Sequence, residues 1–273
     1  MLRQLGLASL VSGTFAASAL AADLPPRAAP PLIPMAPAFT WSGFYIGTHT
    51  GAISLNGDIR TNGNAANTIA NVTANRRPAV LSTDDDFTMM SGIQAGYNVQ
   101  FGSIVLGVEG DISHAGVKAR DVFFSTLNDP SFFRQELHTF GTARARVGFA
   151  FDQVLVYATG GLAGANFTDR VAFLRNTDNA FQFVGRRSTT EYGYTVGGGV
   201  EFSLPESLRQ FAFIGNLLNA SAVTVRAEYL YFDLGDRNVL VNAVPGVGLN
   251  SYTTRFESTG HIGRIGFNYR FGT

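Results

Sequence analysis

This chain of 273 residues shows none of the familiar motifs that bring nucleophiles, bases or metal ligands together. Cysteine is absent, which excludes disulfides, zinc–thiolate sites and thiol nucleophiles. The sequence also lacks the Gly-x-Ser-x-Gly motif that presents a hydrolase serine. The histidines fit no metal-binding spacing such as His-Glu-x-x-His; they are His49, His114, His138 and His261. These patterns predict no catalytic residue, no cofactor and no metal.

Charged residues at alternate positions offer a different chemistry. Arg144 and Arg146 stand two positions apart, and every second residue of a β-strand points to the same face. A charge in a narrow, enclosed space is costly unless it is paired with the opposite sign. We therefore expect a structural network of ion pairs inside the fold. The expected pairs are Glu109 with Arg144 and Arg146, Glu201 with Arg226, and Glu228 with Arg264, and Arg270 completes the set.

Alternation of apolar with polar residues runs through most of the chain from Phe39 onward. The composition is 45% hydrophobic and 15% charged, with a mean hydropathy of +0.10. These values exclude a bundle of membrane helices and suit strands that have one apolar and one polar face. The net charge of zero gives no support to nucleic-acid binding. The predicted strands are 41–52, 89–101, 103–113, 139–151, 154–167, 191–202, 222–233 and 258–271.

The connections between these strands alternate in length. Phe101-Gly102-Ser103 and Asp152-Gln153 are tight turns, whereas the segments 53–86, 114–138, 168–189 and 234–254 are long and polar. Short turns on one side and long loops on the other are typical of an all-β, eight-stranded, antiparallel up-and-down transmembrane β-barrel. One connection on the short side, residues 204–221, exceeds a turn. It leaves open an interfacial helix or a strand extension with an irregular link.

The amino-terminal region has a different composition. Arg3 precedes a mostly apolar stretch that ends in Ala19-Leu20-Ala21, the pattern of a secretory signal peptide. A membrane-anchoring helix is the alternative. Residues 23–38 are rich in proline, which cannot join the interior of a sheet. The predicted organisation is therefore a signal peptide at 1–22, a proline-rich periplasmic segment at 23–38 and a barrel at 39–273.

Several motifs of the sequence resemble one family. The first predicted strand opens with Trp41-Ser42-Gly43-Phe44-Tyr45-Ile46-Gly47, the seventh reads Arg226-Ala227-Glu228-Tyr229, and the last ends in Asn268-Tyr269-Arg270-Phe271. In this order the motifs resemble the small outer-membrane β-barrel surface proteins of Gram-negative bacteria, the porin-family or OmpA/OmpX-like barrels. The family usually stops at its terminal phenylalanine, whereas here Gly272 and Thr273 follow.

The resemblance implies a location and a set of partners. We expect the protein in the bacterial outer membrane, in contact with its lipid and lipopolysaccharide. The resemblance also implies recognition of the carboxyl-terminal strand by the barrel assembly machinery. The loops are expected to face the outside, where they can meet an extracellular ligand or act as surface antigens. No partner among nucleic acids is expected.

The sequence leaves several functions open. The favoured one is a structural and surface-interaction barrel that contributes to envelope integrity and displays four long extracellular loops. An eight-stranded barrel is only just wide enough for side chains to fill, so the charges should form a plug. A narrow porin for small solutes is the alternative, because inward glycines could leave space in the lumen. An outer-membrane lipid-modifying enzyme built on His49 or His261 beside a serine and a soluble lipocalin-like barrel are further alternatives.

Overall fold

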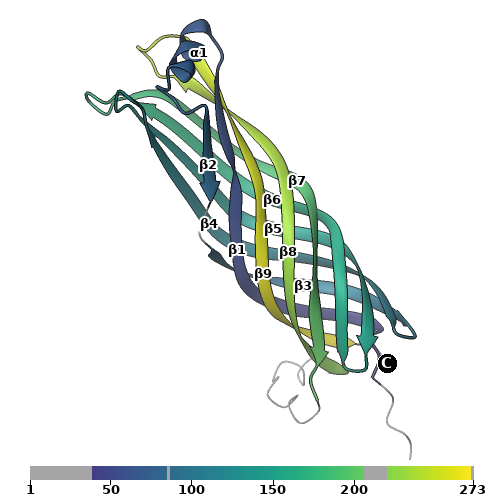
Figure 1. Ribbon diagram of the computed structural model, residues 1–273. Helices are drawn as coiled ribbons and strands as arrows, with labels where there is room; N and C mark the ends of the chain where they lie inside the picture. Colours follow the sequence, from purple (N-terminus) through teal and green to yellow (C-terminus); the bar gives the residue numbers. More distant parts are fainter. Residues whose placement is uncertain (1–38, 85–86, 206–219, 272–273) are drawn as a thin grey trace, which may run out of the picture. The chain divides into compact units, whose positions relative to one another are not determined.

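The computed structural model describes residues 39–84, 87–205 and 220–271 (Figure 1). Strands dominate this part of the chain, and one short helix, α1, follows the first strand. The elements are β1 (Gly43–Gly63), α1 (Ala66–Thr73), β2 (Val80–Asp84), β3 (Thr88–Phe101), β4 (Ile104–Phe124), β5 (Pro130–Phe151), β6 (Val154–Leu174), β7 (Phe181–Ser203), β8 (Ala222–Ala243) and β9 (Ser251–Phe271). Among the described residues no helix is long and apolar enough to span a bilayer.

The long strands close into a ring. Each pairs antiparallel with the next along the chain, from β3 to β9, and β1 pairs with both β3 and β9. Phe44 lies opposite Phe271 at one end of the β1–β9 seam, and Gly63 lies opposite Tyr252 at the other. Short β2 pairs with β1 beyond the end of β3. The prediction of an eight-stranded antiparallel up-and-down barrel is confirmed, with β2 as an addition.

The two ends of the barrel differ in their connections. At one end, called the turn end here, β3 meets β4 through Gly102 and β5 meets β6 through Asp152. Both residues have positive φ angles, +59° and +50°, the conformation that two-residue hairpin turns require. The predicted tight turns are confirmed, and the barrel both begins and ends at this end (Figure 1). The opposite end is called the loop end.

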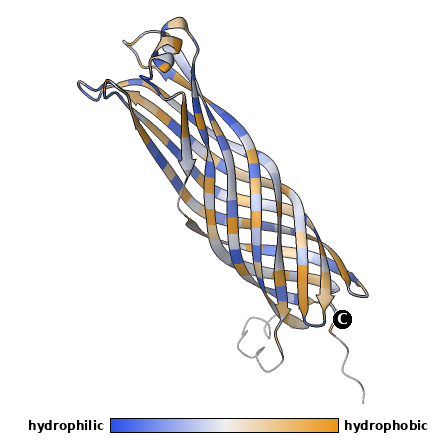
Figure 2. Cartoon of the chain, viewed as in Figure 1, coloured by the Kyte–Doolittle hydropathy of each residue, from blue (hydrophilic) through white to orange (hydrophobic). Residues whose placement is uncertain are grey.

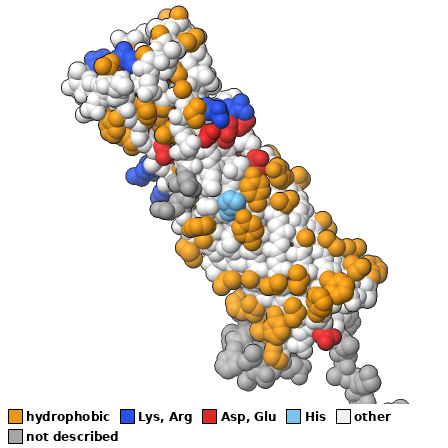
Figure 3. Space-filling model, viewed as in Figure 1, with side chains coloured by type: hydrophobic (Ala, Val, Ile, Leu, Met, Phe, Trp, Pro, Cys, Tyr) orange, Lys and Arg blue, Asp and Glu red, His pale blue; other side chains and the backbone are white. Residues whose placement is uncertain are grey.

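Near the turn end the strands are apolar outside and polar inside. On β9, Ile265 and Phe267 are 59% and 47% exposed, whereas Arg264 and Asn268 on either side of them are buried. Figure 3 shows apolar side chains gathered over this part of the visible face. We call this region, in which charged and amide side chains fill the interior, the turn-side half.

Near the loop end the same strands are apolar inside and mostly polar outside, with exposed apolar exceptions such as Phe124 and Leu240. Tyr252 and Phe256 of β9 are buried, while Arg255 between them is exposed. The inward positions still have the parity of Arg264, so only the chemistry of the two faces changes along the strand. Figure 2 shows hydrophobic and hydrophilic residues alternating along the strands at both ends. We call this region the loop-side half.

The long polar loops predicted from the sequence are largely wrong. Most of 114–138, 168–189 and 234–254 and nearly half of 53–86 lie in strands. The described connections at the loop end are 64–79, 125–129, 175–180 and 244–250. The prediction identified strands by their apolar outward residues. Outside the region that we expect lipid to cover, the outward residues become mostly polar, although the backbone pairing of the strands continues. Of the described loop-end connections, only the one that holds α1 is long. The barrel therefore displays extended strands rather than four long loops.

The interior of the loop-side half consists of apolar layers separated by a buried ion pair. One layer includes Phe140 and Phe232, and a second includes Phe173 and Tyr252. Between them Arg237 donates to Asp169 over 2.9 Å, and its guanidinium carbon lies 3.7 Å from the ring centre of Phe167. The cation is thus paired and packed, as a buried charge requires.

Arg77 covers the second apolar layer at the loop end. It donates to the Leu174 carbonyl and the Gln182 side chain, both over 3.0 Å, and its guanidinium lies 4.9 Å from the ring centre of Phe173. Burial lowers the pKa of the Arg77 guanidinium below its ordinary value. The loop containing α1 thereby packs onto the barrel interior.

Several predictions lie outside the described residues. They are the signal peptide at 1–22, the proline-rich segment at 23–38, most of the connection 204–221 and the terminal Gly272-Thr273. The described ends of that connection are attached to the barrel. The Leu204 amide donates to the Val223 carbonyl, and the Ser221 amide donates to the Arg270 carbonyl, both over 2.8 Å.

Candidate functional site

The densest group of charged side chains lies inside the turn-side half. Glu109 of β4 is its centre, with carboxylate oxygens 2.5 Å from both Arg144 and Arg226. Arg264 and Arg146 lie farther away, at 3.7 and 3.8 Å. Strands β4, β5, β8 and β9 supply these residues, so the network joins opposite walls of the barrel.

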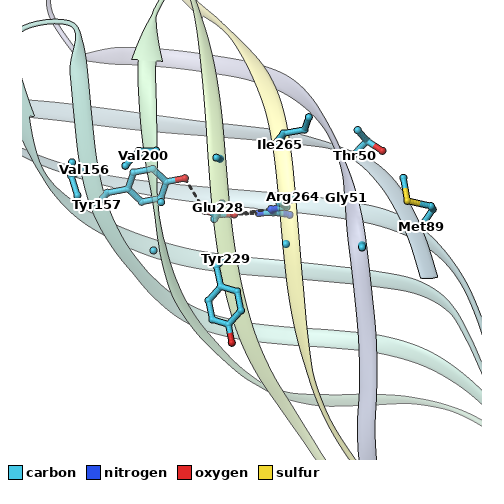
Figure 4. Close-up of a pocket in the computed structure, with 15 residues that line it drawn as sticks. Thr50, Gly51, Met89, Val156, Tyr157, Val200, Glu228, Tyr229, Arg264 and Ile265 are labelled. Carbon is cyan, nitrogen blue, oxygen red and sulfur yellow. Dashed lines mark hydrogen bonds and ion pairs between the residues drawn. The ribbon is translucent and has the colours of Figure 1, made fainter. Parts of the chain in front are cut away.

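Glu228 of β8 is a second centre. Its carboxylate lies 2.6 Å from Arg264 and 3.0 Å from Arg144. The Tyr157 hydroxyl donates to it over 3.0 Å, and Figure 4 shows Tyr157 and Arg264 approaching Glu228 from either side. The expected pairs of Glu109 and Glu228 are therefore present in the structure.

Glu201 of β7 has partners that the sequence did not predict. The backbone register places it opposite Arg226, yet its carboxylate lies 2.9 Å from Arg146 and 3.8 Å from Arg270. Arg226 instead extends toward Glu109. Prediction from neighbouring strands missed this exchange, because in a narrow barrel a long side chain can meet one from a non-adjacent strand.

Asp111 is a member of the network that the predicted set lacks. Its carboxylate lies 3.1 Å from Arg144 and 3.1 Å from Arg264, and it accepts a hydrogen bond from Thr142. It has the same parity as Glu109 on β4, a signal that could have identified it. With Asp111 the network contains four acids and five arginines.

The interior is filled at this level. Side chains lining an aqueous channel would be exposed to water, whereas those of Arg144 and Arg264 are 0% exposed and that of Arg146 is 2% exposed. The inward glycines leave no gap, because large side chains occupy their space. A methyl group at Gly96 would lie 2.4 Å from the Tyr45 hydroxyl, and one at Gly199 would lie 2.8 Å from the Tyr157 hydroxyl.

The histidine that lies beside a serine is buried. His49 lies 2.7 Å from the Ser113 hydroxyl and contacts Gln94, but His49 and Ser113 are only 4% and 1% exposed. A substrate has no visible approach to this pair. His261 lies on the outer wall, 2.7 Å from the Tyr229 hydroxyl. Within the described ranges, no three acidic or histidine side chains are grouped so as to hold a metal ion.

One hollow opens on the outer wall and is lined in part by the inward residues Tyr157, Glu228 and Arg264. Figure 4 shows residues that line it. It has a volume of about 830 Å³, and its lining includes Gly198 and Gly263, which have no side chains to fill it. Exposed apolar side chains including Met89, Val200 and Ile265 line it. Its accessible lining is mainly apolar and suits lipid chains, although the three inward residues belong to the ion-pair network.

A closed antiparallel barrel with an apolar outer wall at one end defines a class, the outer-membrane β-barrel proteins. Residues 7–271 match the model of the family described as "Outer membrane protein beta-barrel domain", and the chain belongs to this family. The protein is thus located in the bacterial outer membrane, as the motifs predicted.

Relatives in other bacteria agree with this assignment. The chain is 28% identical to the 31 kDa outer-membrane immunogenic protein of Brucella melitensis over 267 residues, covering 96% of this chain and 97% of that protein. It is 27% identical to the 25 kDa outer-membrane immunogenic protein of the same species, covering 99% of each. The crystal structure of the outer membrane protein OprG from Pseudomonas aeruginosa shares the fold, with a TM-score of 0.54 at 14% identity, covering 85% of this chain and 97% of OprG.

Proposed function

We propose that this protein is a structural and surface-interaction barrel that contributes to envelope integrity and presents its loop end to the outside. It acts without catalysis and without a metal or cofactor. The main support for this proposal is the filled interior. The ion-pair network centred on Glu109 and Glu228 fills the turn-side half, and apolar layers fill the loop-side half. A barrel that is stabilised along its whole length suits a protein that must stay folded in the membrane and present its loop end to the outside.

The main alternative is a narrow porin. A pore requires a continuous column of water, and its charges would then be hydrated and only weakly coupled. The burial of Arg144 and Arg264, and the side chains that fill the space beside Gly96 and Gly199, support a plug instead. The enzyme alternative is weaker still, because Ser113 and His49 are buried.

The proposed partners follow from the same arrangement. Lipid and lipopolysaccharide contact the outer wall, and the barrel assembly machinery recognises strand β9, whose Phe271 stacks on Phe44 with ring centres 6.1 Å apart. The loop end, which includes α1, is the surface for an extracellular ligand.

Unfolding in urea and planar-bilayer recording test the plug. Glu228→Ala leaves Arg264 and Arg144 buried beside a missing partner, so the free energy of unfolding should fall by about 3–5 kcal/mol. The control is Glu257→Ala, which removes an exposed partner of Arg60 at 3.4 Å and should cost less than about 1 kcal/mol. The wild-type protein should form no stable channels. Steady wild-type channels together with an unaltered unfolding midpoint in Glu228→Ala would support the porin.

A further inference from the structure

Four arginines form a row across the outer wall of the loop-side half. The register places Arg120 of β4 opposite Arg134 of β5, Arg134 opposite Arg170 of β6, and Arg170 opposite Arg186 of β7. All four have outward parity; three are exposed, and the Arg134 side chain is 32% exposed. Neighbouring strands lie ~4.8 Å apart, so the row is ~14 Å long.

Most of this charge has no counterion in the described part of the chain. Arg134 contacts Glu136, but no ion pair of Arg120, Arg170 or Arg186 occurs among the described residues. Exposed arginines elsewhere differ in this respect: Arg255 pairs with Asp236. Like charges directly opposite each other on adjacent strands destabilise a sheet. A row of four therefore needs anions from outside the chain.

The location of the row indicates where those anions are. On β7 the outward aromatic residues that begin near the turn end stop at Tyr192, and Arg186 follows six residues further toward the loop end, ~20 Å along a tilted strand. The row thus lies beyond the main apolar band of the wall, although Val122, Phe124 and Phe132 are exposed further toward the loop end. It faces sideways, parallel to the membrane plane. Its neighbours in that direction are the headgroups of outer-leaflet lipids. A second copy of this wall is disfavoured because two rows of arginine would face each other.

We propose that Arg120, Arg134, Arg170 and Arg186 bind the phosphate groups of a lipopolysaccharide headgroup. Guanidinium groups bind phosphate oxygens with paired, charge-assisted hydrogen bonds. A row at strand spacing can contact several phosphates of one branched headgroup, which a single arginine cannot. The inference rests on the proposed role of the barrel as a component of the envelope, and it assigns the residues that join the barrel to the surrounding glycolipid.

Native mass spectrometry of the folded, full-length protein in detergent tests the assignment. The probes are rough lipopolysaccharide with its phosphates intact and the same material after chemical dephosphorylation. The row variant is R120Q/R134Q/R170Q/R186Q. The matched control is R60Q/R76Q/R175Q/R255Q, which removes four arginines that each have an acidic partner.

We expect the row variant to bind intact lipopolysaccharide at least about tenfold more weakly than wild type. Dephosphorylation of the probe should weaken wild-type binding to a similar extent, and the control should stay within about twofold of wild type. Added salt should reduce the difference between variants, because it screens exposed charges. Equal loss in the row variant and the control would overturn the proposal. So would wild-type binding that survives dephosphorylation.

Two further arms make the result specific. Inorganic phosphate at millimolar concentration should not displace the glycolipid; displacement would identify a free-anion site and overturn the lipid assignment. If the quadruple variant does not fold, R120Q/R170Q takes its place with R60Q/R255Q as control, and a loss smaller than twofold in R120Q/R170Q would overturn the proposal. Heat-dependent gel mobility verifies folding. Channel recordings on wild type report on the plug alone, so failure of one proposal leaves the other measurable.

Discussion

The two halves of the barrel are inverted copies of one pattern. In the turn-side half, Ile265 faces outward and Arg264 inward, whereas in the loop-side half Arg255 faces outward and Phe256 inward. Both pairs lie on β9 without a change of parity. The alternation is a property of the strand, while the choice of face is a property of the surroundings. Lipid outside favours the first arrangement and water outside favours the second.

The inversion also explains the two kinds of interior. Where lipid covers the wall, apolar residues are stable outside, and the interior is held by ion pairs such as Glu109 with Arg144. Where water covers the wall, the apolar residues turn inward and form a core of the kind found in soluble proteins. The chain thus combines a membrane barrel and a water-exposed barrel on continuous strands.

The largest effect is expected in the loop-side core. Phe173→Ala removes a ring that is 0% exposed and contacts Phe133, Phe183 and Tyr252. Urea titration should show a loss of about 3–5 kcal/mol in the free energy of unfolding. Phe132→Ala, an outward neighbour that is 40% exposed, is the control and should cost much less. Similar costs at both positions would mean that this half has no apolar core.

Substitution of an outward residue by arginine distinguishes the surroundings of the two halves more directly. Ile265→Arg places a charge on the lipid-facing wall and should cost about 2–4 kcal/mol for a position near the middle of the bilayer. Thr253→Arg lies on the same strand and has the same outward parity, but in the loop-side half, where the change should stay within about 0.5 kcal/mol. Unfolding from lipid vesicles measures both. Equal costs would refute the assignment of lipid to one half and water to the other.

The smallest effect is expected from glycine substitution, which tests whether side chains fill the lumen. Gly96→Ala forces a methyl group to within 2.4 Å of the Tyr45 hydroxyl and 2.6 Å of the Val108 carbonyl, and overpacking of this kind costs about 1–3 kcal/mol. Gly116→Ala meets no atom within 4 Å and should be neutral or slightly stabilising. A neutral result at Gly96 in urea unfolding would indicate space in the lumen and favour the porin.

Much of the turn-side half could be predicted from the sequence. Its strands, its two tight turns and the inward parity of Glu109, Arg144 and Arg264 all follow from alternation of residue types at a period of two. The loop-side half was missed because the prediction assumed that apolar residues always face outward. Residues such as Phe256 and Tyr252 keep the same period, so the strands were detectable, but the surroundings that select the face were not.

By itself, then, the sequence determined the strand class, the number of long strands and the parity of the charged residues, because these depend on local spacing along the chain. Only the tertiary structure decided which charges meet. Glu201 pairs with Arg146 rather than Arg226, Asp111 joins the network, and four arginines from four strands align into one row. These outcomes depend on strand register and on the narrow diameter of a closed eight-stranded ring, which bring together residues far apart in the sequence.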